Sequence, residues 1–439
     1  MIDTLLTIAG IGLYIPLWVQ LFRTPWNKRT WSRQLVLLML ALELTTVLHV
    51  PSVMYISAGL LFAAVIVYCV IMRPQFRFTP LLIISALYVI YFAISILWSS
   101  WPERGTQFLI DNGLPVLGFA VSASVLQVSK EEWAQILRTF CYAALIFVGL
   151  TILSWGVSCI QLHLAPWQWP FFHKKFIDGW QSFEWIFRFN GGMTGYSHPS
   201  YNLLTIFAAT CAAMHLGKKR ILHPSIGWLL WVGTIVITGI SQSRMGLIYI
   251  VIIFIAGLIY LLPSIRTRLI AGGSIAAVGI IFLCTTHSIW QQYGQDPIRN
   301  ELYAKTWRYI QIKPWTGAGA GALNPVEICH TTGELYWPHI GYIAPDYNMY
   351  TWPWKTRMLP HNQWLADWAH AGIIAALITL ALYIYMIVRS GRQKNYWGVV
   401  FMLIFCIFSC LEPPLYIGKG LYLFCLFGFF VQTYAECKE

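Results

Sequence analysis

Long apolar runs are the sequence feature that most constrains what this chain can fold into. A membrane-spanning helix needs about 20 predominantly apolar residues, and the backbone polar groups of a segment in lipid must pair within that segment. Each run therefore predicts a helix, and because the runs are continuous rather than alternating, they exclude spanning strands. The thirteen runs lie near residues 2–22, 34–50, 53–72, 79–98, 107–127, 133–158, 199–216, 222–240, 244–262, 269–286, 362–388, 396–411 and 415–435.

The composition agrees with a membrane protein. Hydrophobic residues make up 58% of the 439 residues and charged residues 10%, whereas an average soluble domain carries about 25% charged residues. These values exclude an ordinary soluble fold, and they also exclude disorder, which needs the opposite balance. We expect an all-α polytopic membrane protein with about 12–13 transmembrane helices, forming a single transmembrane domain over residues 1–439.

The basic residues predict the orientation of the chain. The net charge of +12 is scattered through loops, which is a topology signal, so no nucleic-acid partner is expected. Seventeen basic residues lie on one set of short loops and three on the other. This bias places the first set in the cytoplasm and two long loops, residues 159–198 and 287–361, outside. If all thirteen runs span, the N-terminus is outside; if the first run is peripheral, twelve spans leave both ends inside.

The longer outer loop, residues 287–361, is rich in Trp, Tyr, Pro and Gly. Loops of that length are usually functional or disordered, and the aromatic content argues against disorder, so we expect a folded outer cap. One of its segments predicts an amphipathic helix on which Arg299, Tyr303 and Trp307 share a face; a loop helix with a solvated basic face is the alternative. The glycine-rich residues 313–321 that follow can let the backbone approach a ligand closely.

Two further residues lie at outer membrane boundaries. Arg244 begins a very apolar helix, where an arginine either snorkels to the interface or binds an anion through its planar guanidinium. His361 lies where the long loop returns to the membrane; a neutral histidine there can take a proton from a hydroxyl, although a single histidine is also a common structural residue. The histidines show no metal-ligand spacing, so we expect neither a metal nor another cofactor.

Acidic residues inside the apolar runs are few, and such residues are functional hypotheses by default. Glu412, directly before two prolines at an outer helix end, can orient an arginine or the histidine. The acidic residues that we expect within the membrane are Glu43, Asp111, Asp367 and Glu412.

In their order along the chain, these pieces resemble the O-antigen ligase and polymerase superfamily of bacterial inner-membrane glycosyltransferases. That family has an arginine on an outer-loop helix, a Pro-x-x-Gly-x-Gly turn, and a His-Asn-x-x-Leu sequence where the chain next enters the membrane. Here the matching pieces are Arg299, residues 314–319 and residues 361–365. The serine-arginine pair that contains Arg244, at a helix start, also matches.

Three further positions extend the resemblance. Residues 198–202 look like the family's His-Pro-Asn region, with a Ser-Tyr pair inserted before the asparagine. Arg188 precedes this region, as an arginine often does in the family, and Glu412 matches a common acidic position near the family's end. The N-terminal third of the chain matches in hydropathy alone.

The resemblance implies a GT-C-like architecture in which the large loop, residues 287–361, caps an active site that faces the periplasm. It points most closely to an O-antigen ligase, a metal-independent inverting enzyme that moves a glycan from undecaprenyl diphosphate to lipid A–core. Arg244 and Arg299 would bind the diphosphate, and His361 would activate the acceptor hydroxyl. The positions that would support the site are Arg188, His198, Tyr303, Arg308, Asn362 and Glu412.

Three other functions stay open. An O-antigen polymerase uses a second lipid-linked glycan as acceptor, and a protein O-oligosaccharyltransferase uses Ser or Thr; the motifs do not separate these from a ligase. The compact second loop, without the extra outer domain of many protein-glycosylating relatives, favours a ligase. A lipid or glycan transporter would place ionisable residues at the midplane and repeat its halves, whereas here the charged candidates lie at outer ends and no halves repeat.

Overall fold

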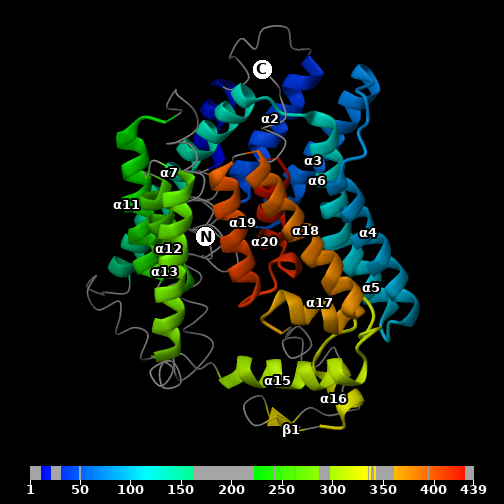
Figure 1. Cartoon of the computed structure of the whole chain (residues 1–439). Helices are drawn as coiled ribbons and strands as arrows, with labels where there is room; N and C mark the ends of the chain where they lie inside the picture. Colours follow the sequence, from blue (N-terminus) through cyan, green and yellow to red (C-terminus); the bar gives the residue numbers. More distant parts are fainter. Residues whose placement is uncertain are drawn as a thin grey trace.

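The computed structural model describes residues 11–20, 31–48, 51–161, 222–241, 244–260, 262, 264–285, 297–334, 336–337, 341–342, 360–393 and 395–430. Within these residues the chain forms a bundle of long helices, and shorter helices lie across one end of it (Figure 1). The described strands, β1 (Tyr336–Trp337) and β2 (Gly341–Tyr342), form one small antiparallel pair. The prediction of an all-α polytopic membrane protein is confirmed.

Apart from α5 and the loop helices α15 and α16, the described helices follow the predicted apolar runs. Their bounds are Ile11–Gln20, α2 (Trp31–Thr46), α3 (Pro51–Met72), α4 (Pro80–Ser95), α5 (Pro102–Phe108), α6 (Leu114–Leu126), α7 (Lys130–Gln161), α11 (Pro224–Ser241), α12 (Arg244–Tyr260), α13 (Ile265–Thr285), α15 (Pro297–Ile312), α16 (Pro325–Thr332), α17 (Gln363–Ala371), α18 (Ile373–Arg392), α19 (Tyr396–Ser409) and α20 (Gly418–Cys425). The π-helical turn Leu109–Gly113 joins α5 to α6, and a second, Leu426–Phe430, continues α20. Because α7 continues to Gln161, the first long loop begins later than the predicted residue 159; the rest of it lies outside the described residues.

Five helical segments of the described chain are long and apolar enough to cross a membrane. They are Val53–Met72, Pro80–Trp98, Pro102–Leu126, Glu131–Leu153 and Ile373–Arg392. Several of their apolar side chains face outward, as Ile66 and Val70 do at 63% and 70% exposure, which suits a surface solvated by lipid. The total of about 12–13 crossings stays a prediction, because the run at residues 199–216 lies outside the described residues.

One predicted run proves to be two helices. Residues 362–388 form α17 and the first part of α18, and the chain breaks between them at Gly372, where φ is +81°. A Cβ at this position would overlap the backbone of Trp315, and the N–H of Ile373 donates to the carbonyl of Pro314 at 3.0 Å. The break needs glycine because the backbone of the loop after α15 lies directly against this position and leaves no room for a Cβ. Hydropathy does not reveal this contact.

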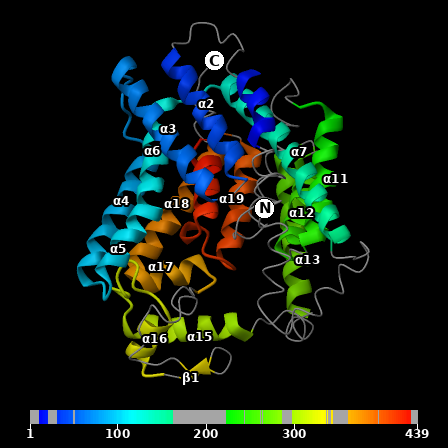
Figure 2. The ribbon, with the colours of Figure 1, turned by 180° about the vertical axis from the view of Figure 1, so that it is seen from behind.

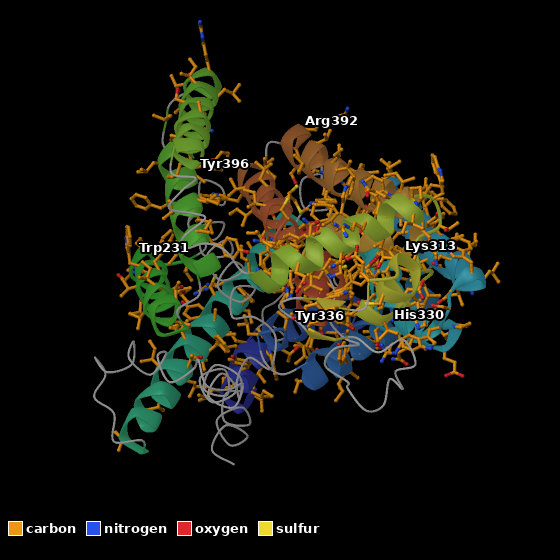
Figure 3. The ribbon with its side chains drawn as sticks, turned by 90° about the horizontal axis from the view of Figure 1, so that it is seen from below. Trp231, Lys313, His330, Tyr336, Arg392 and Tyr396 are labelled. Atoms are coloured by element: carbon orange, nitrogen blue, oxygen red, sulfur yellow. The ribbon has the colours of Figure 1, made fainter. Side chains whose placement is uncertain are left out.

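We call the described part of the long loop from Pro297 to Trp337, which contains α15, α16 and β1, the cap. It has a hydrophobic core separate from that of the bundle. The buried members of that core are Leu302, Tyr309, Ile310, Ala318, Ala322, Leu323, Ile328, Cys329, Trp337 and Ala369. Because Ala369 belongs to α17, the cap packs directly on that helix, and α15 lies across the end of the bundle (Figures 2 and 3). We call this end of the bundle the cap end.

Candidate active site

Three of the predicted residues, from separate parts of the chain, meet at the cap end. Arg299 lies in the first turn of α15, His361 lies just before α17, and Glu412 lies in the turn after α19. One carboxylate oxygen of Glu412 is 2.6 Å from Nη2 of Arg299. The other is 2.7 Å from Nδ1 of His361. Glu412 therefore bridges the arginine and the histidine, and we call this arrangement the Glu412 bridge.

Glu412 is the buried centre of the bridge. The residue is 3% exposed, whereas the side chains of Arg299 and His361 are 31% and 32% exposed. A buried carboxylate is costly unless it is paired and hydrogen-bonded, and here each of its oxygens has such a partner. Nη1 of Arg299 also lies 3.4 Å from the carbonyl oxygen of Leu411. The two partly exposed groups are the ones that can reach a ligand.

The backbone around His361 is fixed by its neighbours. Asn362 is the N-cap of α17, and its side-chain oxygen accepts from the N–H of Leu365 at 3.0 Å, which is the usual role of an asparagine at this position. Its side-chain nitrogen donates to the carbonyl of Cys410 at 3.1 Å. The hydroxyl of Tyr303 donates to the carbonyl of His361. The position of the histidine is therefore fixed jointly by α15, α17 and the turn after α19.

The position of Glu412 follows from the two prolines after it. The N–H of Glu412 still donates to the carbonyl of Phe408 at 2.9 Å, but Pro413 and Pro414 have no N–H with which to continue α19. The chain turns instead through a 3-10 helix, Pro414–Tyr416. The sequence predicts that Glu412 orients either an arginine or the histidine. In the structure its carboxylate contacts both Arg299 and His361.

The bridge also assigns the two nitrogens of His361. Nδ1 faces a carboxylate, and a carboxylate at Nδ1 favours the tautomer that carries its proton there. Nε2 is then the nitrogen that can accept a proton from a substrate hydroxyl. In that arrangement the carboxylate would also stabilise the charged imidazolium formed afterwards.

The other predicted site residues fall into two groups. Arg308 pairs with Glu334 in the cap rather than with the bridge, because it lies on a different face of α15 from Arg299. Arg244 begins α12, as predicted, but its side chain lies outside the described part of the structure. The positions of Arg188 and His198 also lie outside it.

The glycine-rich turn after α15 approaches protein backbone rather than an evident ligand position. Gly317, Gly319 and Gly321 have φ values of +59°, +87° and +72°. The N–H of Gly319 donates to the carbonyl of His370 at 2.6 Å, and a Cβ on Gly317 would lie 2.6 Å from the carbonyl oxygen of Ala369. The close approach of this backbone to a ligand stays a prediction; among the described residues the turn packs onto the end of α17.

Three polar residues lie beside the bridge; the sequence singled out Asp367 only as an acidic residue within an apolar run, and it did not single out Gln363 or Tyr416. Gln363 and Asp367 follow His361 on α17, and Tyr416 follows Glu412 in the turn. A polar pair four residues apart in an apolar run is a signal that was available for the first two. Tyr416 has no comparable signal, because its contacts depend on how the turn folds back. Among the described residues, no group of three or more His, Cys, Asp or Glu side chains comes together as a metal site would require.

Comparison with known protein families finds that residues 228–380 match the family described as O-antigen ligase. The matched segment includes Arg244, Arg299 and His361, and it ends before Glu412. A search of curated proteins finds no matching relative. The chain therefore carries an O-antigen ligase family domain at residues 228–380, which supports its membership of the O-antigen ligase superfamily.

Proposed function

We propose that the chain is an O-antigen ligase that moves a glycan from undecaprenyl diphosphate to a sugar hydroxyl of lipid A–core. The observation that carries the proposal is the Glu412 bridge, which holds Arg299 and His361 together at one end of a membrane bundle. The planar guanidinium suits a diphosphate, and an imidazole suits a hydroxyl acceptor because it can take a proton near neutral pH. The family match at residues 228–380 supports the same class of reaction.

In the proposed reaction, Nε2 of His361 takes the proton of the acceptor hydroxyl. The hydroxyl oxygen attacks the anomeric carbon of the donor at the same time. The bond from that carbon to the diphosphate oxygen breaks, and its electron pair leaves with the lipid diphosphate. Arg299, together with Arg244 at the start of α12, stabilises the negative charge that develops there. Attack opposite the leaving group inverts the anomeric centre. No metal is needed, because the two guanidinium groups supply the positive charge.

We also propose that the cap end faces the periplasm of a bacterial inner membrane. α18 starts beside α17 at the cap end and ends at the other side of the bundle (Figure 1), with Arg389 and Arg392 in its last turn. Basic residues gather on the cytoplasmic side of membrane proteins. The cap and the bridge would then lie outside, where a lipid-linked glycan and lipid A–core meet.

A lipopolysaccharide gel of a strain that lacks this chain tests the proposal. Loss of all glycan on the core supports a ligase. Core that carries a single repeat unit would indicate an O-antigen polymerase instead, and normal lipopolysaccharide with unglycosylated pilin would indicate a protein transferase. Returning the intact chain should restore the glycan, whereas His361→Ala, present in the membrane at the same level, should not.

A further inference from the structure

We propose that Gln363, Asp367 and Tyr416 are positioning residues that hold the Glu412 carboxylate at its distance from His361. This inference rests on the proposed transfer reaction, because it gives these residues a role in that reaction. They act through the two backbone segments that carry the bridge, the start of α17 and the turn after α19.

Gln363 links the two segments directly. It is the first residue of α17 and closely follows His361. Its side-chain oxygen accepts from the N–H of Leu415 at 2.9 Å, and its side-chain nitrogen donates to Oδ1 of Asp367 at 2.9 Å. Because Leu415 belongs to the turn that carries Glu412, this side chain ties the turn to the start of α17.

Tyr416 makes a second tie between the same segments. Its hydroxyl donates to Oδ1 of Asp367 at 2.7 Å, so this one oxygen accepts from Gln363 and from Tyr416. The tyrosine ring stacks on His370, with ring centroids 4.9 Å apart, and packs against Phe108 at 5.0 Å. The far side of the turn is therefore fixed to α17 by a hydrogen bond and by ring packing.

These ties bracket Glu412 along the chain. On its N-terminal side, Asn362 donates to the carbonyl of Cys410 at 3.1 Å. On its C-terminal side, the ties reach Leu415 and Tyr416. Both ends of the turn are thus attached to α17 and its N-cap, and a shift of about 1 Å in either end would take the bonds of the bridge out of hydrogen-bond range.

The burial of these polar groups indicates that their role is to constrain distances and angles through hydrogen bonds. Gln363 and Asp367 are both 0% exposed, and burying an amide and a carboxyl costs free energy unless they are hydrogen-bonded. Apolar side chains would pack this helix without that cost. Hydrogen bonds, however, constrain distance and angle, whereas dispersion contacts are non-directional and individually weak. A carboxylate that must meet two partners needs the directional support.

The test is a double-mutant cycle with Glu412→Gln, measured as glycan transfer by the purified chain in lipid nanodiscs. The substrates are a lipid-diphosphate-linked glycan and a core acceptor. We expect Gln363→Leu and Tyr416→Phe each to lower kcat about tenfold, with the KM for the donor changed less than about threefold. In the Glu412→Gln background each should lower kcat by less than about twofold, because the group that they position is already gone.

Matched variants separate positioning from general stability. Tyr88, a buried tyrosine of α4 that is 1% exposed, has a hydroxyl without a hydrogen-bond partner among the described residues, so Tyr88→Phe should leave kcat unchanged. Asp367→Asn keeps an oxygen that accepts from both neighbours and should retain most activity, whereas Asp367→Leu should not. Tyr416→Phe keeps the ring stack on His370, so it tests the hydrogen bond even if Gln363→Leu does not fold.

His361→Ala and Arg299→Ala separate this inference from the proposed function. If both variants keep wild-type transfer, the proposed function is wrong. If both abolish transfer while Gln363→Leu and Tyr416→Phe behave like Tyr88→Phe, the positioning role is wrong. The positioning role is also wrong if Gln363→Leu and Tyr416→Phe change KM alone. It is equally wrong if these two variants lower kcat in the Glu412→Gln background as much as in the wild type.

Discussion

Nδ1 of His361 lies 2.7 Å from Oε2 of Glu412. The other oxygen of the same carboxylate lies 2.6 Å from Arg299, so a single rigid group sets the spacing between the imidazole and the guanidinium. In the proposed reaction the imidazole acts on the acceptor hydroxyl, and the guanidinium acts on the leaving diphosphate. Holding them on one support pre-organises both before the substrates arrive, which removes reorganisation from the reaction step.

We expect Glu412→Gln to lower the kcat of glycan transfer by about 10²-fold or more. Arg299 and His361 contact different oxygens of Glu412. An amide puts an NH₂ donor in place of one of these oxygens, so one of the two contacts loses its acceptor. The measurement is transfer by purified protein in nanodiscs at saturating donor. Glu412→Asp keeps both oxygens on a shorter side chain and should fall between the wild type and Glu412→Gln. A folded Glu412→Gln protein with wild-type kcat would refute the role of the bridge.

Arg299→Lys should fail to replace the arginine. Lysine keeps the charge but lacks the planar fork that can bind Glu412 and a phosphate oxygen together, so we expect kcat/KM for the donor to fall about 10- to 100-fold. The control is Lys313→Ala, which removes a basic residue that pairs with Glu327 at 3.1 Å, outside the bridge, and should change kcat/KM less than about twofold. Wild-type kcat/KM in Arg299→Lys would mean that charge alone suffices.

Gly319→Ala should destabilise the chain far more than Gly333→Ala. Both glycines have positive φ, +87° and +72°, so each alanine costs about 1 kcal/mol in backbone strain. A Cβ on Gly319 would also overlap the backbone of Ser99, whereas one on Gly333 would meet nothing within 4 Å, and relieving that overlap adds about 1–3 kcal/mol. Thermal unfolding in detergent measures the difference, and equal Tm values for the two variants would contradict it.

Contacts set by helix periodicity could be predicted from the sequence. The spacing of Arg299 and Tyr303 placed them on one face of a helix, and in the structure both reach the bridge region, Arg299 at Glu412 and Tyr303 at the carbonyl of His361. Arg308 shares the helix but not the face, and it pairs with Glu334. The periodicity of a helix is a local property, so it can be read without knowing what packs against it.

The bridge itself could not be predicted, because its members are far apart in the chain. His361 and Glu412 are separated by 51 positions, and Arg299 and Glu412 by 113. They meet because α18 and α19 pack against each other and return the chain to the cap end. The break at Gly372 is similar, since hydropathy is continuous across it and its cause is the backbone of a distant loop.

Glu334 gives the cap a contact that acid should weaken. Lys305 and Arg308 both donate to its carboxylate, and the bond from Lys305 is the main reason that the pKa of Glu334 lies below its ordinary value. The unfolded chain lacks these partners, so the contact stabilises the fold above the ordinary pKa of a glutamate and is lost as pH falls through the lowered one. The Tm difference between the wild type and Glu334→Gln should therefore shrink below about pH 4.5. A constant difference from pH 7 to pH 3 would contradict this.

Two introduced cysteines test which side of the membrane the cap occupies. His330 on α16 and Arg392 at the end of α18 are exposed, and they lie at opposite ends of the bundle. Since basic residues favour the cytoplasm, an impermeant maleimide should label His330→Cys in cells with an intact inner membrane, and Arg392→Cys only after that membrane is opened. Cys410, an exposed native thiol near the bridge, is changed to Ser in both variants, and Cys410→Ser alone sets the background. The reverse labelling would put the bridge in the cytoplasm, where the proposed periplasmic transfer could not occur.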